Sequence, residues 1–286
     1  MSNQNEIESP PESENVATGL SWSATTDIGR VRKDNEDAFL ALEMDAKEVR
    51  RLGKIGKAGF DEGDMIFAVS DGMGGHNAGE FASRIAVEKI TELLPTAFRL
   101  EAQGMHRGAP DLLEELCHRI LDEIKRLGEA YSELEGMGAT LSLCWFAPDW
   151  MHFCHVGDSR IYYLPVDGKM KQVSEDHTYT AWLVRTGRLT PSQARFHPKK
   201  NILSQSLNAK CTTIEPQIGS IGFEPGDRFV ICSDGLTDGL SDPNIDDIVR
   251  NRPDRYGERS AAESIVYQSV CNSGKDNTTA VVVEAV

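Results

Sequence analysis

The sequence lacks several features that define other classes of protein. Its 6 cysteines include no Cys-x-x-Cys pair and follow no regular spacing, so we expect a reducing, cytoplasmic compartment. The N-terminus has no basic segment followed by an apolar stretch and does not resemble a secretory signal. No apolar run approaches the length of a membrane span. The sequence therefore predicts a cytoplasmic protein that does not cross a membrane.

Basic residues are also scarce. There are 30 Lys and Arg against 45 Asp and Glu, and the net charge at pH 7 is -15. This balance disfavours nonspecific binding to nucleic acid or to an anionic membrane. It suits a protein that collects divalent cations, although the needs of a soluble surface explain most of the excess. With 286 residues, 40% of them hydrophobic, the chain can form a sizeable core, and we expect a monomer.

Apolar periodicity predicts three long helices. They span 77–94, where Pro95 follows the end, then 112–127, and finally 260–271. The inward positions of the first helix are Phe81, Ile85, Ala86, Ile90, Leu93 and Leu94. Strands lie in blocks before, between and after these helices, which indicates an α+β layered domain rather than alternating βαβ units.

Two stretches differ from the rest of the chain. Residues 1–18 are polar and have the composition of a disordered tail. Residues 175–215 are mixed and contain a short helical pattern at 181–185 and a helix start at Thr190-Pro191. We expect a small flap subdomain there, and an ordinary long connection is the alternative.

Four aspartates stand at the ends of four apolar runs that have the length of buried strands. Asp71 follows 65–70, Asp158 follows 151–157, Asp234 follows 228–233, and Asp276 precedes 278–283. If the last strand is antiparallel to one of the others, all four carboxylates converge at one sheet edge. Converging carboxylates repel one another, and a bound cation relieves that repulsion. Oxygen ligands without a Cys/His cluster favour Mg²⁺, Mn²⁺ or Ca²⁺ over zinc.

An ordinary turn is the alternative for each of these aspartates taken singly. Asp-Gly and Asp-Ser are common turn pairs, because Asp accepts local backbone hydrogen bonds and Gly tolerates positive φ. The shared placement of all four is harder to explain in this way. Spacing alone leaves both interpretations open.

Five motifs occur in order along the chain. They are VSDGMGGH at 69–76, GMGAT at 136–140, HVGDSR at 155–160, CSDGLTD at 232–238 and DNT at 276–278, with GRVRKDNED at 29–37 upstream. From about residue 20 to the C-terminus, the chain resembles the metal-dependent protein phosphatases (protein phosphatase 2C-like) in their bacterial serine/threonine form. The resemblance implies one phosphatase domain at 19–286, with the flap at about 175–215.

The resemblance also implies a fold and a metal site. The family fold is a β-sandwich of two antiparallel sheets flanked by helices on both sides, with the metals in a cleft at one edge. By this resemblance two Mn²⁺ or Mg²⁺ ions are bridged by Asp71 and held further by Asp234, Asp276 and the Gly72 carbonyl, with Glu36 and Asp37 acting through metal-bound water. Asp158 and Asp238 match the ligands of a third, weaker metal ion.

Arg32 matches the family position that grips the substrate phosphate. Arg30 lies two residues away and shares its strand face if the segment is extended, so only the motif favours Arg32. Some family members carry a histidine, the suspected general acid, where this chain has Met73, which cannot donate a proton. His76 and His177 are the candidate acids here, and a metal-bound water is a further one.

The implied activity is hydrolysis of phosphoserine and phosphothreonine in proteins. Two divalent ions lower the pKa of a bridging water, while the metals and a bidentate arginine offset charge on the phosphoryl oxygens. The implied partners are phosphorylated proteins, either substrates of a bacterial serine/threonine kinase or the kinase itself.

Three other functions are alternatives to hydrolysis of phosphoserine and phosphothreonine. A pseudophosphatase would bind phosphoproteins without turnover, but the intact set of four aspartates argues against it. A regulator that dephosphorylates an anti-sigma-factor antagonist would use the same chemistry on a different partner. A plain Ca²⁺-binding domain is disfavoured because the EF-hand pattern is absent.

Overall fold

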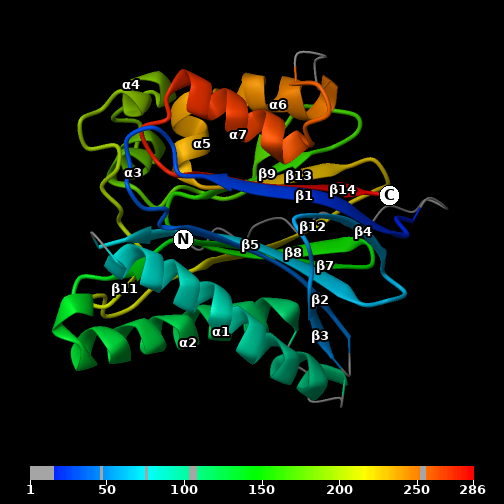
Figure 1. The fold of residues 1–286 in the computed structure, drawn as a ribbon, viewed down its shortest axis with the longest axis horizontal. Coiled ribbons are helices and arrows are strands. Elements are labelled where there is room, and N and C mark those ends of the chain that lie inside the picture. The colour runs from blue at the N-terminus through cyan, green and yellow to red at the C-terminus, as the bar shows by residue number, and fades with distance from the viewer. Residues whose placement is uncertain (1–15, 46–47, 75–76, 103–107, 252–255) are drawn as a thin grey trace.

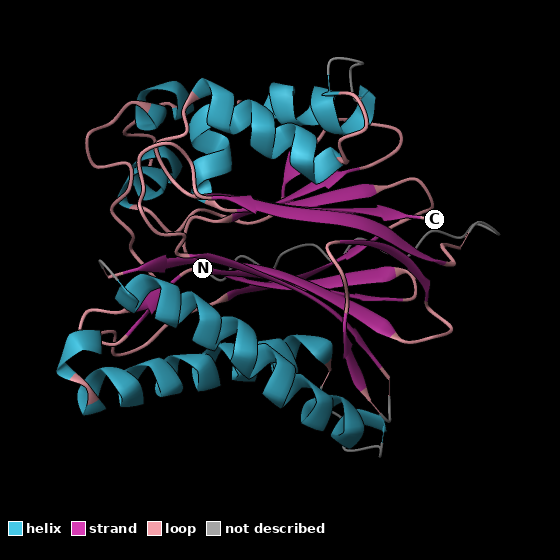
Figure 2. Ribbon diagram, in the orientation of Figure 1, coloured by secondary structure: helices cyan, strands magenta, loops and turns pink. Residues whose placement is uncertain are grey.

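The computed structural model describes residues 16–45, 48–74, 77–102, 108–251 and 256–286. Two antiparallel β-sheets pack face to face, and helices cover the outer side of each (Figures 1 and 2). This confirms the predicted α+β class and the β-sandwich. Most of the predicted tail, 1–15, lies outside the described residues, and Ala17 already packs in the core between the sheets.

The first sheet, called here the β14 sheet, has the strand order β10-β9-β13-β14-β1-β4. Its strands are β1 (Gly19–Asp27), β4 (Ile55–Gly59), β9 (Arg160–Leu164), β10 (Lys171–Gln172), β13 (Arg228–Cys232) and β14 (Thr278–Ala285). The central pair, β13 and β14, is antiparallel, with Cys232 opposite Ala280. The end of β13 and the start of β14 therefore lie at the same edge.

The second sheet, called here the β5 sheet, has the order β11-β6-β5-β7-β8-β12, and β2 and β3 extend it from β5. Its strands are β2 (Asp37–Met44), β3 (Val49–Arg51), β5 (Asp64–Met73), β6 (Gly138–Ala139), β7 (Leu141–Ala147), β8 (Trp150–Val156), β11 (Leu207–Asn208) and β12 (Gln217–Gly222). Both β5 and β8 are antiparallel to β7, so they end at the same edge.

Helices form the two outer layers and one end of the molecule. The β5 sheet is covered by α1 (Asn77–Ala102) and α2 (Ala109–Ala130), which is followed by the short helix η1 (Ser132–Leu134). The β14 sheet is covered by α5 (Asp234–Gly239), α6 (Asp242–Asn251) and α7 (Ala261–Asn272). Two short helices, α3 (Tyr179–Arg185) and α4 (Pro191–Arg195), lie together at one end of the sandwich (Figure 1).

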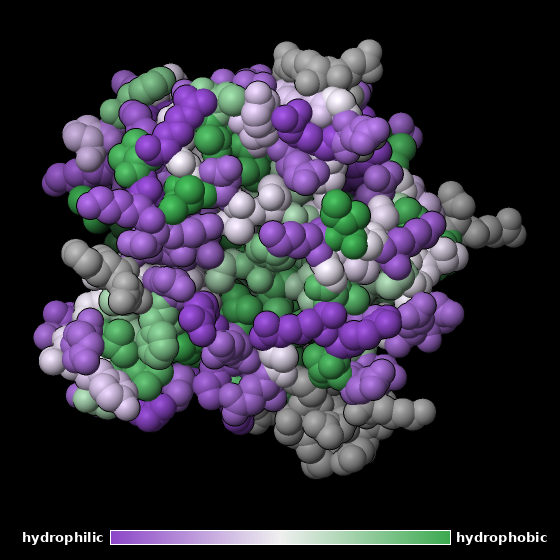
Figure 3. Space-filling model, in the orientation of Figure 1, coloured by the Kyte–Doolittle hydropathy of each residue, from purple (hydrophilic) through white to green (hydrophobic). Residues whose placement is uncertain are grey.

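Burial on both faces explains the unbroken apolar runs in the sequence. In β5, Met65, Phe67 and Val69 pack in the core between the sheets. Ile66 and Ala68 point the other way, into the layer of α1 and α2. Successive side chains of a strand alternate between faces, so a strand covered on both sides is apolar at every position. Hydrophobic residues gather accordingly in the middle of the face in Figure 3, where the two sheets meet.

The first predicted helix differs from the structure in two ways. We predicted that it ends at Leu94, just before Pro95, but α1 continues to Ala102. A proline inside a helix removes one intrahelical hydrogen bond, and this loss does not end the helix here. Phe81 was predicted to face inward and is 38% exposed, whereas Ala82 and Ala86 are fully buried. The small side chains let the helix lie close to the β5 sheet.

The other predicted helices are confirmed. The second is α2, and the third is α7, which starts after Ser260, whose side chain accepts a hydrogen bond from the Glu263 amide at 3.3 Å. In the 175–215 segment, Thr190 caps α4 in the same way. No helix among the described residues is long and apolar enough to cross a membrane. None of the 6 cysteines, all described, forms a disulfide.

Candidate active site

The ends of both sheets bring the predicted carboxylates together. Asp234 follows β13 and Asp276 precedes β14 at one edge of the β14 sheet. Asp71 lies near the end of β5 and Asp158 follows β8 at one edge of the facing sheet. We predicted convergence at a single sheet edge, but the four aspartates come from two sheets. They are close enough to interact electrostatically, because Asp158, Asp234 and Asp276 all contribute to raising the pKa of Asp71.

A chain of hydrogen bonds joins the two sheets beneath these carboxylates. Asp37, at the start of β2, lies directly opposite Asp71 in the β5 sheet. The Ser233 hydroxyl donates to Asp37 Oδ2 at 2.7 Å and accepts from the Thr279 amide at 3.0 Å. Burial raises the pKa of Asp37 to about 6. Hydrogen bonds from the Thr279 and Ser233 side chains lower this pKa, and the charges of Asp276 and Glu36 raise it.

The carboxylate cluster has the character of a site for divalent cations. Among the described residues, Asp37 Oδ1 and Asp234 Oδ1 are buried without a hydrogen-bond partner, although buried carboxylate oxygens are normally paired. Burial, followed by the neighbouring aspartates, raises the pKa of Asp71 and Asp234 well above the ordinary range. Unpartnered oxygens in a cluster of repelling carboxylates fit a hard cation such as Mg²⁺ or Mn²⁺.

Cations of the protein itself hold part of this cluster. Arg32 Nη2 donates to Asp276 Oδ2 at 2.7 Å, and Lys200 forms an ion pair with Asp238. Within the described part of the chain, no three carboxylate, imidazole or thiolate groups lie close enough to surround a single ion. The donor set fits the metals by its chemistry, and its side chains need to move closer together to surround one.

The loop that carries Arg32 and Glu36 is fixed by Asn277. The Asn277 amide donates to the carbonyls of Ile28 at 2.9 Å and Asp34 at 3.0 Å, and its Oδ1 accepts from the Glu36 amide at 2.8 Å. Arg32 Nη1 lies 3.7 Å from Glu36 Oε2, and burial raises the pKa of Glu36. Asn277 thus places both side chains beside the carboxylate cluster.

Arg30 and Arg32 point to different surroundings. The Arg30 amide donates to the Gly274 carbonyl at 2.7 Å, and the aliphatic part of its side chain packs beside that glycine. Arg32 instead reaches Asp276, and its side chain remains 46% exposed. Of the two arginines, only Arg32 is placed by the structure against a predicted metal ligand.

Gly72 lies where the backbone of three segments meets. Its amide donates to the Glu36 carbonyl at 3.1 Å. A Cβ on Gly72 would lie 2.1 Å from the Gly79 carbonyl oxygen, in the first turn of α1. Only glycine permits this approach, which brings the end of β5, the start of α1 and Glu36 together.

Asp158 and Asp238 lie at the side of the cluster that faces the 175–215 segment. Gly157, directly before Asp158, has φ +115°, and a Cβ there would lie 2.6 Å from the Thr140 side chain. Burial, then the charge of Asp176, raises the pKa of Asp158 to about 7. Asp238, on α5, is paired with Lys200 of the 175–215 segment.

The structure describes only one of the two histidines proposed as general acid. His76 lies outside the described residues. His177 is buried, and its Nδ1 accepts a hydrogen bond from the Gly157 amide at 3.2 Å. Its own amide donates to the Gly157 carbonyl at 2.7 Å, and burial lowers the pKa of its imidazole. In this position His177 holds the turn that presents Asp158.

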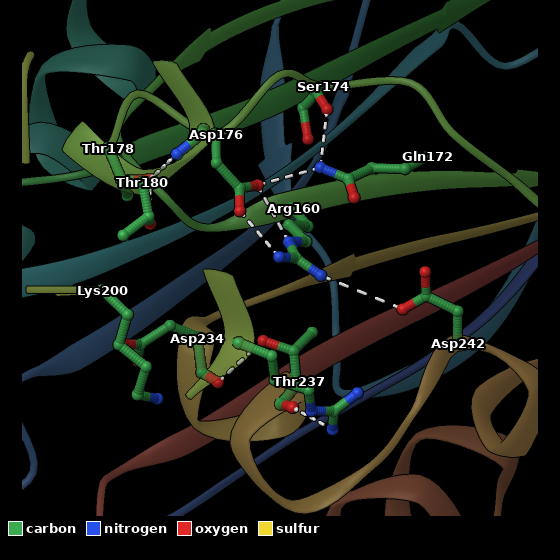
Figure 4. Close-up of polar contacts among 12 residues, drawn as sticks. Arg160, Gln172, Ser174, Asp176, Thr178, Thr180, Lys200, Asp234, Thr237 and Asp242 are labelled. Carbon is green, nitrogen blue, oxygen red and sulfur yellow. Dashed lines mark hydrogen bonds and ion pairs between the residues drawn. The ribbon is translucent and has the colours of Figure 1, made fainter. Parts of the chain in front are cut away.

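A polar cleft of about 660 Å³ opens beside Asp158, Asp234 and Asp238. Its walls come from β9, α3 and α4 on one side and α5 and α6 on the other. At its base Arg160 donates to both oxygens of Asp176, at 2.8 and 2.6 Å, and faces Asp242 at 3.9 Å (Figure 4). A bidentate pair of this kind is rigid, so the base of the cleft has a fixed polar shape.

Sequence reasoning assigned no role to several residues that build this site. Asn277, Ser233, Thr140 and Arg160 all stand within the five motifs, yet nothing in the sequence distinguishes a side chain that binds ligand from one that holds backbone. The Thr140 hydroxyl accepts from the Asp71 amide at 3.0 Å and lies 2.5 Å from the Ser159 hydroxyl. Their position within the five motifs was the only signal in the sequence.

A family model described as Protein phosphatase 2C matches residues 54–267. The chain belongs to this family.

Relatives of this protein phosphatase 2C chain are bacterial proteins. It is 32% identical over 274 residues to the serine/threonine protein phosphatase PstP of Mycobacterium tuberculosis, covering 95% of this chain and 46% of that protein. The chain thus spans about half the length of PstP. It is also 32% identical over 268 residues to the serine/threonine phosphatase stp of Listeria innocua, covering 91% of this chain and 93% of the relative.

Solved structures share the fold. The S. agalactiae serine/threonine phosphatase superimposes with a TM-score of 0.78 at 28% identity, covering 93% of this chain and 100% of the other. The catalytic domain of PstP, in complex with 2 manganese ions, gives a TM-score of 0.72 at 29% identity, covering 94% and 99%. These likenesses confirm the resemblance drawn from the motifs and the predicted sandwich.

Proposed function

We propose that this chain is a metal-dependent phosphatase that hydrolyses phosphoserine and phosphothreonine in proteins. The observation that carries the proposal is the buried carboxylate cluster, with unpartnered oxygens on Asp37 and Asp234, at the end of a protein phosphatase 2C sandwich. Relatives named as serine/threonine phosphatases, one of them solved with 2 manganese ions, support the same activity.

The residues that would hold the cofactor are those of the cluster. Asp71 would bridge two Mn²⁺ or Mg²⁺ ions, with Asp234, Asp276 and the Gly72 carbonyl as further ligands and Glu36 and Asp37 in an outer position. Asp158 and Asp238 would hold a third, weaker ion. When bound, such ions supply a water nucleophile at neutral pH and neutralise charge on the phosphoryl group.

Arg32 has the position of a phosphate-binding residue. Its guanidinium is half-exposed, donates one hydrogen bond to a carboxylate oxygen of Asp276 and lies 3.7 Å from Glu36. A phosphate offers two oxygens to the same guanidinium fork, which is the stronger geometry. We infer that the substrate phosphate replaces Asp276 as the partner of Arg32 and leaves that carboxylate free to bind metal.

The proton for the departing serine or threonine oxygen has two candidate sources among the histidines. For His177, burial and the hydrogen bond from Gly157 favour the positioning of the Asp158 turn over proton transfer. His76 keeps the role of candidate acid on its sequence position alone. A metal-bound water is the remaining candidate.

The partners proposed from the sequence follow from this chemistry. They are phosphorylated proteins, substrates of a serine/threonine kinase or the kinase itself, and the chain would act on them as a cytoplasmic monomer that binds no nucleic acid. The net charge of -15 supports the last point. The alternative of a pseudophosphatase gains no support from the relatives, whose names are those of phosphatases.

Phosphate release from a phosphothreonine peptide tests the proposal. Chelated protein is assayed with and without added Mn²⁺ or Mg²⁺, and we expect release only with metal. Asp234→Asn is expected to lower the rate by more than about 100-fold, because it removes a ligand charge. Metal binding without phosphate release by the wild-type chain would contradict the proposed phosphatase activity and favour a phosphoprotein-binding module.

A further inference from the structure

The 175–215 segment differs in charge from the rest of the molecule. Between His177 and Ile214 the sequence has no Asp or Glu, although the whole chain carries a net charge of -15. The same stretch contains six cations: Arg185, Arg188, Arg195, Lys199, Lys200 and Lys210. A stretch whose charged residues are all basic, on an acidic protein, indicates attraction for a negatively charged partner.

Some of these cations hold the segment on the body. Arg195 donates to the carbonyls of Thr237 and Leu240, each at 3.1 Å. Arg185 pairs with Glu175 at 3.0 Å, and Lys200 pairs with Asp238. These side chains already have partners and line the cleft, so they explain only part of the basic charge.

Two other cations lie over exposed aromatic rings instead. The Arg188 guanidinium carbon is 4.8 Å from the centre of the Trp182 ring, and Lys199 Nζ is 5.7 Å from that of Tyr179. The two rings stack with centroids 5.9 Å apart. Neither cation forms an ion pair with a carboxylate of the described residues. We call Tyr179, Trp182, Arg188 and Lys199 the cation–aromatic face.

This face is open to solvent and apolar in part. Tyr179 is 38% and Trp182 39% exposed, and nearby Phe196 reaches 82%. Figure 3 shows hydrophobic residues exposed among hydrophilic ones on the side of the molecule where α3 and α4 lie. Exposed aromatics beside cations are typical of surfaces that bind a partner, because the rings supply area and the cations supply direction.

The cation–aromatic face lies close to the candidate active site. Thr180, Ala181 and Val184 line the cleft that also contains Asp158 and Asp234. Tyr179 and Trp182 belong to the opposite side of the same helix, α3, which is only 7 residues long. A helix is about 10 Å across, so an extended peptide of about three or four residues covers the distance.

We propose that the cation–aromatic face docks an acidic segment of the phosphoprotein substrate, a few residues from the phosphorylated residue in the cleft. The proposal rests on the proposed function and adds a preference for acidic flanking sequence. Arg188 and Lys199 face the carboxylates, and the rings of Tyr179 and Trp182 cover the peptide backbone and apolar atoms. The net charge of -15 on the whole chain disfavours a long polyanion such as RNA.

The test compares two phosphothreonine peptides of equal length, one with Asp and Glu flanks and one with Ser and Gln flanks. We expect wild-type protein with Mn²⁺ to show a kcat/KM about 10-fold higher for the acidic peptide, mainly through KM. The ratio follows from two exposed charge pairs of ordinary strength plus attraction at longer range. High salt should reduce it, because exposed charges are screened.

The double variant Arg188→Glu/Lys199→Glu should lose this preference and hydrolyse p-nitrophenyl phosphate at the wild-type rate. The matched control is Arg51→Glu/Lys57→Glu, which makes the same change of charge at exposed positions of β3 and β4, on the far side of the molecule from α3 (Figure 1). It should keep the preference. If the first variant loses turnover of the small ester, Arg188→Gln/Lys199→Gln replaces it, with the same expected loss of preference.

Three results would overturn the proposal. They are equal turnover of both peptides by wild-type protein, a preference that survives in the face variants, and a preference that the control variant loses equally. Competition by a single-stranded RNA as strong as that by an unphosphorylated acidic peptide of equal charge would also overturn it, in favour of a nucleic-acid surface. Failure to hydrolyse any phosphate ester with metal would instead contradict the proposed function.

Discussion

At the residue scale, Asp37 and Asp234 show how the site sets function against stability. Each has a buried carboxylate oxygen with no hydrogen-bond partner among the described residues. An unsatisfied buried acceptor costs about 1–3 kcal/mol, and nearby carboxylates add repulsion. A bound cation would remove both penalties. Such a cluster persists because the surrounding strands over-determine its position.

This balance predicts opposite effects of Asp234→Asn with and without metal. In chelated protein, the amide can donate to a neighbouring carboxylate and removes one negative charge, so the free energy of unfolding should rise by about 1–3 kcal/mol. In Mn²⁺ the variant should instead be less stable than wild type, because it binds the metal more weakly. Urea unfolding measures both differences.

Asp122→Asn serves as the control for that comparison, because Asp122 is exposed on α2. Its effect should stay within about 0.5 kcal/mol under both conditions. A loss of stability in chelated Asp234→Asn would show that this carboxylate is well accommodated without metal and that the repulsion argument is wrong.

At the element scale, the contact between β5 and α1 depends on glycine. Gly72 and Gly79 allow the end of the strand to touch the first turn of the helix, and the Glu36 side chain packs against Gly79. The main chain beside Asp71 is therefore fixed by backbone contact rather than by side-chain packing.

Gly72→Ala is expected to disrupt this contact. The added Cβ would lie 2.1 Å from the Gly79 carbonyl oxygen, and backbone cannot move aside as a flexible side chain can. Overpacking of this kind costs about 1–3 kcal/mol, and urea unfolding of chelated protein measures it. Gly136→Ala is the matched control, because a Cβ there meets nothing within 4 Å. Equal stability of the two variants would contradict the close-approach argument.

The segments around the site differ in how they are held. In the loop before β2, a single side chain, Asn277, bonds to Ile28, Asp34 and Glu36. In the 175–215 segment, the side chains of Arg195 and Lys200 bond to α5 and the residue after it. The first arrangement fixes Arg32 beside the cluster, and the second leaves the outer face of α3 free for a partner.

At the scale of the whole molecule, the proposed metal ligands belong to both halves of the sandwich. Asp71 comes from the β5 sheet, whereas Asp234 and Asp276 come from the β14 sheet. Ions bound between them would join the two sheets and would bind only the folded chain. Metal should therefore stabilise the global fold and not merely the local loops.

Thermal unfolding in the presence of Mn²⁺ tests this link. A concentration of about 100 times Kd should add about 2.7 kcal/mol, which corresponds to a rise in Tm of about 5–10 °C for a chain of this size. Chelation should reverse the rise, and Asp234→Asn should show much less of it. An equal rise in that variant would place the metal away from the cluster.

The sequence by itself determined many of the local elements and the group of residues that form the candidate site. Strands buried on both faces and amphipathic helices leave periodic apolar patterns, so β5, β14, α2 and α7 could be located before any coordinates. The motif order identified Asp71, Asp158, Asp234 and Asp276 as a group, since the type and position of a residue at a strand end are properties of the chain alone.

Only the tertiary structure decided which side chains meet. The pairing of Arg32 with Asp276, the burial of His177 and the bonds of Asn277 join residues far apart in sequence, and no local pattern encodes such contacts. The continuation of α1 through Pro95 likewise runs against local preference. Local signals report the energy of a segment in isolation, whereas the site is built from the contacts that the folding of both sheets creates.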